Sequence, residues 1–115
     1  MASDPREPRV PPTAWLLCQR FNAWIVGSAA LLKLRAEDPE PEDVDVMVPW
    51  PEWQEACSLI PRNCTTTLFR GWRFVEDGIT VDVWPDTLDR LASSPKFVAA
   101  WHPMSGTRLV KDKGG

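Results

Sequence analysis

The sequence lacks any apolar run approaching the ~20 residues of a membrane-spanning helix, and it lacks a basic excess. Lys and Arg number 13 against 16 Asp and Glu, for a formal net charge of -3. Such a balance does not supply the broad basic footprint that tight, sequence-independent nucleic-acid binding needs. The basic and apolar segments of a secretory signal peptide are also missing. We therefore expect a cytoplasmic protein that binds no membrane and recognises a small or localised partner.

Histidine and cysteine are scarce, with one His and three Cys in 115 residues. No two cysteines form a CxxC pair, and their odd number and apolar or β-prone neighbours favour reduced thiols. A zinc site is therefore not expected, and no Ser/His/Asp or Cys/His set typical of nucleophilic catalysis is visible. We interpret His102, in a Trp-His-Pro segment, as a turn residue rather than a catalytic base.

Tyrosine is absent, whereas seven Trp are unusual for this length and indicate a well-filled core. The length suits one domain and is too short for two independent cores. Residues 1–12 contain four prolines and little apolar content, which predicts a flexible proline-rich leader. We expect a single domain over residues 13–110 and a frayed tail over residues 111–115.

The hydrophobic pattern alternates between strand and helix periods. A helix is predicted from a Thr13 cap to Phe21, and another over 50–60 with Pro51 in its first turn. Shorter helices are predicted over 29–34 and 87–91. Strands are predicted, with a hairpin turn at Asp77-Gly78, over 23–26, 43–48, 65–69, 72–76 and 79–84. Residues 97–101 and 107–110 form either a closing strand pair or a helix end and a strand. The fold class is thus α+β (α/β), with a mixed sheet of four to six strands flanked by helices.

Acidic side chains alternate with valines in the strand over 43–48. Asp43 and Asp45 therefore share one face, and Asp82 lies on the polar face of the strand over 79–84. Mg²⁺ prefers oxygen ligands and is commonly shared between a few carboxylates and substrate phosphates. Acidic alternation usually marks a solvated strand face. The order of the surrounding elements nevertheless favours a site for Mg²⁺ (or Mn²⁺) formed by these three acids.

Gly27 and Ser28 lie between a predicted strand and a predicted helix. Glycine lets the backbone approach a phosphate closely, the following helix offers unpaired N–H groups, and Ser28 adds a hydroxyl donor. The same pair also serves as a turn and helix cap, and the two interpretations coexist. Arg73, with Arg70, is a candidate clamp for phosphate oxygens, although arginines on a hairpin are more often solvated.

These motifs resemble those of the nucleotidyltransferases of the DNA polymerase beta superfamily. The resemblance covers most of residues 22–84 and rests on IVGSAAL (25–31), EDVDVMV (42–48) and TVDV (80–83). It implies a mixed sheet flanked by helices. It also implies metal-dependent transfer of a nucleoside monophosphate from a nucleoside triphosphate (NTP) to a hydroxyl, with release of pyrophosphate.

The resemblance also implies roles for individual residues. Gly27 and Ser28 would grip the triphosphate. Asp43 and Asp45 would bind both metal ions, while Asp82 would bind the catalytic metal and assist the attacking hydroxyl.

Fuller members of the family carry a substantial helical domain after the third aspartate, and this sequence shows none there. In length and motif it is similar to small stand-alone, phage-encoded or toxin-associated members. The acceptor (RNA, protein or small molecule) and the base preference stay open. One alternative is a catalytically silent nucleotidyltransferase-fold binding module or regulatory subunit acting on a protein partner. Another is a subunit that gains its acceptor site by homo-oligomerising or by pairing with a helical partner.

Overall fold

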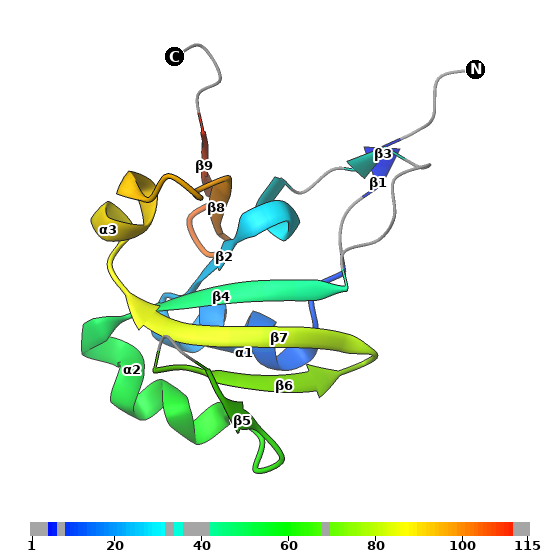
Figure 1. Ribbon diagram of the computed structural model, residues 1–115, viewed down its shortest axis with the longest axis vertical. Helices are drawn as coiled ribbons and strands as arrows, with labels where there is room; N and C mark the ends of the chain where they lie inside the picture. Colours follow the sequence, from blue (N-terminus) through cyan, green and yellow to red (C-terminus); the bar gives the residue numbers. More distant parts are fainter. Residues whose placement is uncertain (1–4, 7–8, 32–33, 36–41, 68–69, 112–115) are drawn as a thin grey trace.

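A computed structural model describes the chain except for residues 1–4, 7–8, 32–33, 36–41, 68–69 and 112–115. The main strands are β2 (Trp24–Val26), β4 (Asp43–Pro49), β5 (Thr65–Thr66), β6 (Trp72–Glu76), β7 (Ile79–Asp86), β8 (Ala99–His102) and β9 (Thr107–Val110). They form one sheet in the order β5-β6-β7-β4-β2-β8-β9 (Figure 1). β4 and β7 run parallel, and the other neighbours in this sheet are antiparallel.

This mixed sheet confirms the predicted α+β class. It has seven strands, more than the expected four to six, because both closing segments become strands and pair as β8 and β9. β7 also continues two residues beyond its predicted end, since Pro85 and Asp86 still lie alongside β4. The β6–β7 hairpin turns at Asp77 and Gly78, which have φ values of 54° and 77°, as expected for the two central residues of a type I′ turn.

Part of the expected leader is attached to the domain. A separate two-stranded sheet pairs β1 (Pro5–Arg6) with β3 (Leu34–Arg35), and neither strand was predicted. Pro11 is fully buried and Val10 packs against the core. The side chain of Arg9 donates a hydrogen bond to the backbone carbonyl of Asp77, with a donor-acceptor distance of 3.0 Å.

The three α-helices are α1 (Pro12–Phe21), α2 (Trp50–Ala56) and α3 (Leu88–Ser93). The prediction that Thr13 caps α1 was wrong, because the helix begins two residues earlier than such a cap requires, with Pro11 in the capping position. Glu76 of β6 supplies the missing acceptor instead. The backbone N–H of Thr13 donates to Glu76 Oε1 at 2.7 Å, and its hydroxyl donates to Oε2 at 2.6 Å.

Two short 3-10 helices replace or extend predicted α-helix. Residues 57–59 form η2 (Cys57–Leu59), which continues α2. The segment predicted as a buried helix over 29–34 is instead η1 (Gly27–Leu31), a single 3-10 segment in which Ala29 and Ala30 are buried. Its first residue, Gly27, has a left-handed φ of 76°, so the chain turns sharply out of β2.

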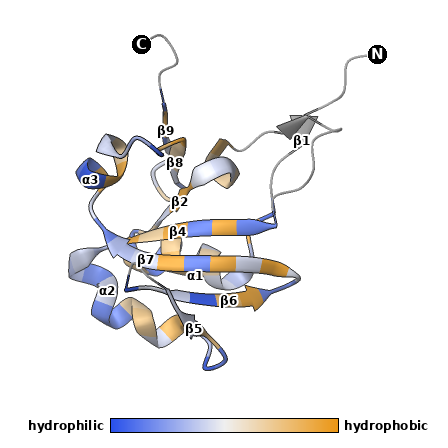
Figure 2. Ribbon diagram, viewed as in Figure 1, coloured by the Kyte–Doolittle hydropathy of each residue, from blue (hydrophilic) through white to orange (hydrophobic). Residues whose placement is uncertain are grey.

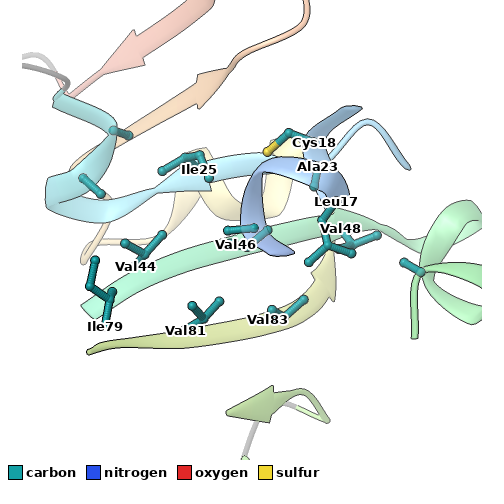
Figure 3. Packing of buried hydrophobic residues seen from close by; sticks show 14 of the residues in the cluster. Leu17, Cys18, Ala23, Ile25, Val44, Val46, Val48, Ile79, Val81 and Val83 are labelled. Atoms are coloured by element: carbon teal, nitrogen blue, oxygen red, sulfur yellow. The ribbon is translucent and has the colours of Figure 1, made fainter. Parts of the chain in front are cut away.

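Hydrophobic and hydrophilic positions alternate along β4 and β7 (Figure 2). The valines of both strands point to one face, where α1 and α2 cover them (Figure 3). Fully buried side chains of this core include Leu17, Cys18, Ile25, Val44, Val46, Val48, Val81 and Val83. Burial raises the pKa of the Cys18 thiol to about 12, so this cysteine is an unreactive core residue. The aspartates of both strands occupy the opposite face.

A second, smaller cluster lies on that opposite face. Val26, Met47 and Ala100 are buried there, and partly buried side chains pack around them: Trp24, Trp84, Leu88, Leu91 and Phe97. α3 covers this part of the sheet. Within the residues that the structure describes, no helix is long and apolar enough to cross a membrane.

Candidate functional site

Two of the predicted acids are direct neighbours in the sheet. Asp45 of β4 and Asp82 of β7 are Cα partners across the parallel strand pair. Asp82 is in turn the partner of Arg73 on β6, and Asp45 the partner of Val26 on β2. Opposed residues of neighbouring strands project to the same face. The fold thus lines up Asp45, Asp82 and Arg73 in a single cross-strand row, which we call the acid row.

Asp82 forms an ion pair with Arg73. The Nε–H of Arg73 donates to Asp82 Oδ1 at 2.7 Å, and Nη2 donates to Oδ2 at 3.4 Å. The arginine side chain is 57% exposed, whereas that of Asp82 is 17% exposed. The hydrogen bond to Asp82, followed by its charge, raises the pKa of Arg73 above its ordinary value. The arginine is therefore the solvent-exposed partner of the pair, and the carboxylate is the partner packed into the sheet.

Asp45 lacks comparable neutralisation. Its pKa is raised from 3.8 to about 6, first by desolvation through burial and then by the charges of Asp82 and Asp43, against a lowering by the charge of Arg73. A carboxylate in this state is stabilised by any cation placed beside it. The acid row and Asp43 therefore form a centre of excess negative charge.

Gly27 lies against the same carboxylate. A Cβ atom at this position would be 3.1 Å from Asp45 Oδ2, and the backbone φ of 76° disfavours any other residue. Ser28 follows it and is exposed. The predicted helix N-terminus is reduced to the first turn of η1, so its contribution to anion binding comes from a few N–H groups and not from a long helix dipole.

Asp43 lies on β4, two residues before Asp45 of the acid row. It is exposed, projects to the same face as Asp45, and has Thr80 as its Cα partner on β7. Among the residues that the structure describes, no three His, Cys, Asp or Glu side chains are arranged to hold a metal ion. The donor set of carboxylate oxygens and the charge on Asp45 suit a hard divalent cation. For Asp43, Asp45 and Asp82 to hold one cation together, the hydrogen bonds between Arg73 and Asp82 would have to break.

The Arg73–Asp82 pair is the feature that our interpretation of the sequence missed, since Arg73 was expected to contact phosphates. The signal was available. A two-residue turn at Asp77-Gly78 makes Glu76 the partner of Ile79, and counting three residues outward on each side pairs Arg73 with Asp82. Arg70, the second candidate clamp, is exposed in the loop before β6, with a φ of 62°.

A separate cavity of about 410 Å³ contains none of the predicted site residues. Its lining comes from the end of η1 and the C-terminal part of the chain: Leu31, Pro95, Lys96, Phe97, Val98, Val110 and Lys111. His102 also lies outside the acid row. Its ring packs at a tilt of 57° against Trp24 with centroids 4.9 Å apart, and its Nδ1 is 2.8 Å from the Ser105 hydroxyl. The prediction of a turn residue was wrong by one position, because His102 is the last residue of β8 and pairs with Thr107 before the turn begins.

No family model matches the chain, and no curated protein matches it. Among solved structures, the chain is similar to one described as "The complex structure of CCA-adding enzyme with ATP", with a TM-score of 0.55 and 18% sequence identity. The match covers 92% of this chain and 31% of that chain. This chain has a nucleotidyltransferase-like fold. It spans less than a third of the length of that enzyme chain.

Proposed function

We propose that the chain is a metal-dependent nucleotidyltransferase of the small stand-alone type. It transfers a nucleoside monophosphate from an NTP to a hydroxyl of an acceptor and releases pyrophosphate. The observation that carries the proposal is the in-register pair of Asp45 and Asp82, on adjacent parallel strands and beside the left-handed turn at Gly27. Two acids and a glycine turn on the sheet face opposite the valine core match the requirements of phosphoryl transfer.

Asp43, Asp45 and Asp82 would hold Mg²⁺ or Mn²⁺, which when bound supplies charge neutralisation at the transferring phosphate. Asp82 accepts the proton of the attacking hydroxyl. The acceptor oxygen then forms a bond to the α-phosphorus, the bond from that phosphorus to the bridging oxygen breaks, and pyrophosphate leaves with the electron pair. Gly27 leaves room for the triphosphate beside Asp45, and Ser28 donates a hydrogen bond to a phosphate oxygen.

The similar enzyme structure supports a nucleotide substrate, because it is described as a complex with ATP. The acceptor is an RNA, a protein or a small molecule. We propose that a helical partner or a second copy of this chain recognises the acceptor. Size measurement and co-purification test this assignment directly.

The function is tested by incubating the protein with each labelled NTP, Mg²⁺ or Mn²⁺, and candidate acceptors, and by measuring pyrophosphate release. Asp45→Asn should lower the rate by at least about 100-fold, because it removes a ligand charge. Asp77→Asn is the matched control, since it makes the same chemical change in the exposed hairpin turn. No release with any NTP, or equal rates for both variants, contradicts the proposal.

A second candidate function is a binding module that keeps the fold but performs no transfer. It is favoured by the ion pair that occupies Asp82 and by the absence of a ready metal cluster among the described residues. The double variant Asp43→Asn with Asp45→Asn separates the two functions. A docking protein keeps its biological effect in this variant, whereas an enzyme loses it.

A further inference from the structure

The positive charge of Arg73 suits two anionic partners, the Asp82 carboxylate and a phosphate group of the proposed substrate. Its guanidinium holds Asp82 through the contacts of 2.7 and 3.4 Å. The same group, 57% exposed, belongs to the acid row, next to which the triphosphate is proposed to bind. Asp82 occupies the Nε–Nη2 edge of the guanidinium, so a two-donor contact of that edge with a phosphate requires Arg73 to leave Asp82.

We propose that Arg73 exchanges partners when substrate binds: it turns from Asp82 to the triphosphate and leaves the Asp82 carboxylate to the metal ion. The exchange rests on the proposed function and deepens it. In the unloaded protein Arg73 acts as an internal counter-ion for Asp82. In the loaded protein the metal ion replaces Arg73 as the counter-ion of Asp82, and the triphosphate replaces Asp82 as the counter-ion of Arg73. Metal and triphosphate therefore bind cooperatively at this site.

The exposure of the pair fits such an exchange. An ion pair with a solvent-exposed arginine adds little to stability, because water competes for its donors. Arg73 can therefore leave Asp82 without disturbing the sheet. Asp82, by contrast, lies between β4 and β6 and keeps its place beside Asp45. The arginine is the element that moves, and the carboxylate stays in position for the metal.

The acid row offers a matched comparison for a test. Asp45 and Asp82 are adjacent, belong to the same row, and each carry one negative charge. The hydrogen bonds to Arg73 come to Asp82. Replacing either acid by Asn removes the same charge near a bound anion, whereas only Asp82→Asn also releases the guanidinium. The difference between the two variants isolates the ion pair from general electrostatics.

The first measurement is the affinity of the full chain for inorganic tripolyphosphate, without metal, at pH 8. Asp82→Asn should bind it about tenfold more tightly than Asp45→Asn, the effect of one additional charge-assisted hydrogen bond. Adding Arg73→Gln to Asp82→Asn should abolish that gain. Equal affinities of the two Asn variants, or a gain that survives Arg73→Gln, overturns the exchange.

The second measurement is the binding of Mn²⁺ alone, followed by its paramagnetic resonance signal. Arg73→Gln should bind Mn²⁺ several-fold more tightly than the wild type, because Asp82 becomes free, and adding Asp82→Asn should reverse the gain. Arg20→Gln, on the opposite face of the sheet in α1, controls for loss of a positive charge. This measurement also decides the matter if Asp82→Asn fails to fold, since Arg73 is largely exposed. An unchanged Mn²⁺ affinity overturns the exchange.

The outcomes separate the exchange from the proposed function. Pyrophosphate release by the wild type, together with equal binding by the two Asn variants, overturns the exchange alone. The predicted binding differences without any pyrophosphate release support the exchange and contradict the transfer reaction. If tripolyphosphate binds none of the proteins and the wild type releases no pyrophosphate, both are overturned.

Discussion

Asp45 and Asp82 face each other across the parallel strands β4 and β7, although they are far apart in the sequence. Both lie on the sheet face opposite the valine core, and each raises the electrostatic energy of the other. Two adjacent carboxylates do not stabilise a fold unless a cation lies beside them. Acids held together in this way are typical of functional sites, where local stability is given up for chemistry.

Replacing Asp45 by Asn should stabilise the metal-free protein. The pKa of Asp45 is about 6 in the folded state, against 3.8 for an ordinary aspartate, so the folded state holds this proton more tightly. Stability therefore falls as pH rises between these two values, and the loss persists above pH 6. At pH 8 we expect Asp45→Asn to gain on the order of 1 kcal/mol after allowance for solvent screening. Denaturant unfolding at pH 8 measures the gain, which should vanish near pH 3. A variant less stable than the wild type at pH 8 contradicts the charge argument.

The activity should depend on pH through the same carboxyl group. Because its pKa is about 6, Asp45 becomes protonated as the pH falls through that value and then binds a cation poorly. Mn²⁺ affinity should therefore drop below about pH 6, about two pH units above the point expected for an ordinary aspartate. A Mn²⁺ titration between pH 4.5 and 8 measures the midpoint. A midpoint near pH 4 would show that the three acids do not interact as described.

Two of the three described glycines with a left-handed φ provide a matched pair. Gly27 and Gly78 have φ values of 76° and 77°, and a Cβ at Gly78 would meet nothing within 4 Å, whereas one at Gly27 would approach Asp45 Oδ2. Each change to Ala should destabilise the fold by about 1 kcal/mol through backbone strain. Gly27→Ala should in addition slow pyrophosphate release roughly 10- to 100-fold by displacing the carboxylate. Equal activity of the two variants argues against a role for Gly27 beside the triphosphate.

Glu76 should contribute to stability and not to function. Its carboxylate accepts both hydrogen bonds from Thr13 at the start of α1, a contact across 63 residues of sequence. Glu76→Ala should lower the free energy of unfolding by about 1 kcal/mol, the usual effect of losing a helix cap. Glu55→Ala, at an exposed position of α2, should leave stability nearly unchanged. Tripolyphosphate affinity should be the same in both variants.

Much of the fold follows from local patterns in the sequence. The alternation of valine and aspartate over residues 43–48 fixed which side chains are buried, and the Asp77-Gly78 turn fixed the β6–β7 hairpin. Helix boundaries were less predictable. Whether Thr13 or a distant glutamate caps α1 depends on the position of β6, which no local pattern of α1 contains. The replacement of a predicted α-helix by η1 depends in the same way on where the chain must go after Leu31.

The sequence predicted which residues form the candidate site, but not how they pair with one another. Asp43, Asp45 and Asp82 share the expected face because strand alternation has a fixed period. The parallel pairing of β4 with β7, which brings Asp45 beside Asp82, is a long-range choice that alternation does not specify. The ion pair of Arg73 was within reach, because the hairpin register determines it. The metal ligands and the triphosphate contacts of Gly27, Ser28 and Arg73 stay predictions.

The most direct test of the account is a crystal structure of the chain with Mg²⁺ and a non-hydrolysable nucleoside triphosphate. We predict density for a cation between Asp45 and Asp82, with the triphosphate along Gly27 and Ser28 and with Arg73 turned from Asp82 to a phosphate. A structure that binds the nucleotide elsewhere, or that retains the Arg73–Asp82 pair with no cation beside Asp45, contradicts the account.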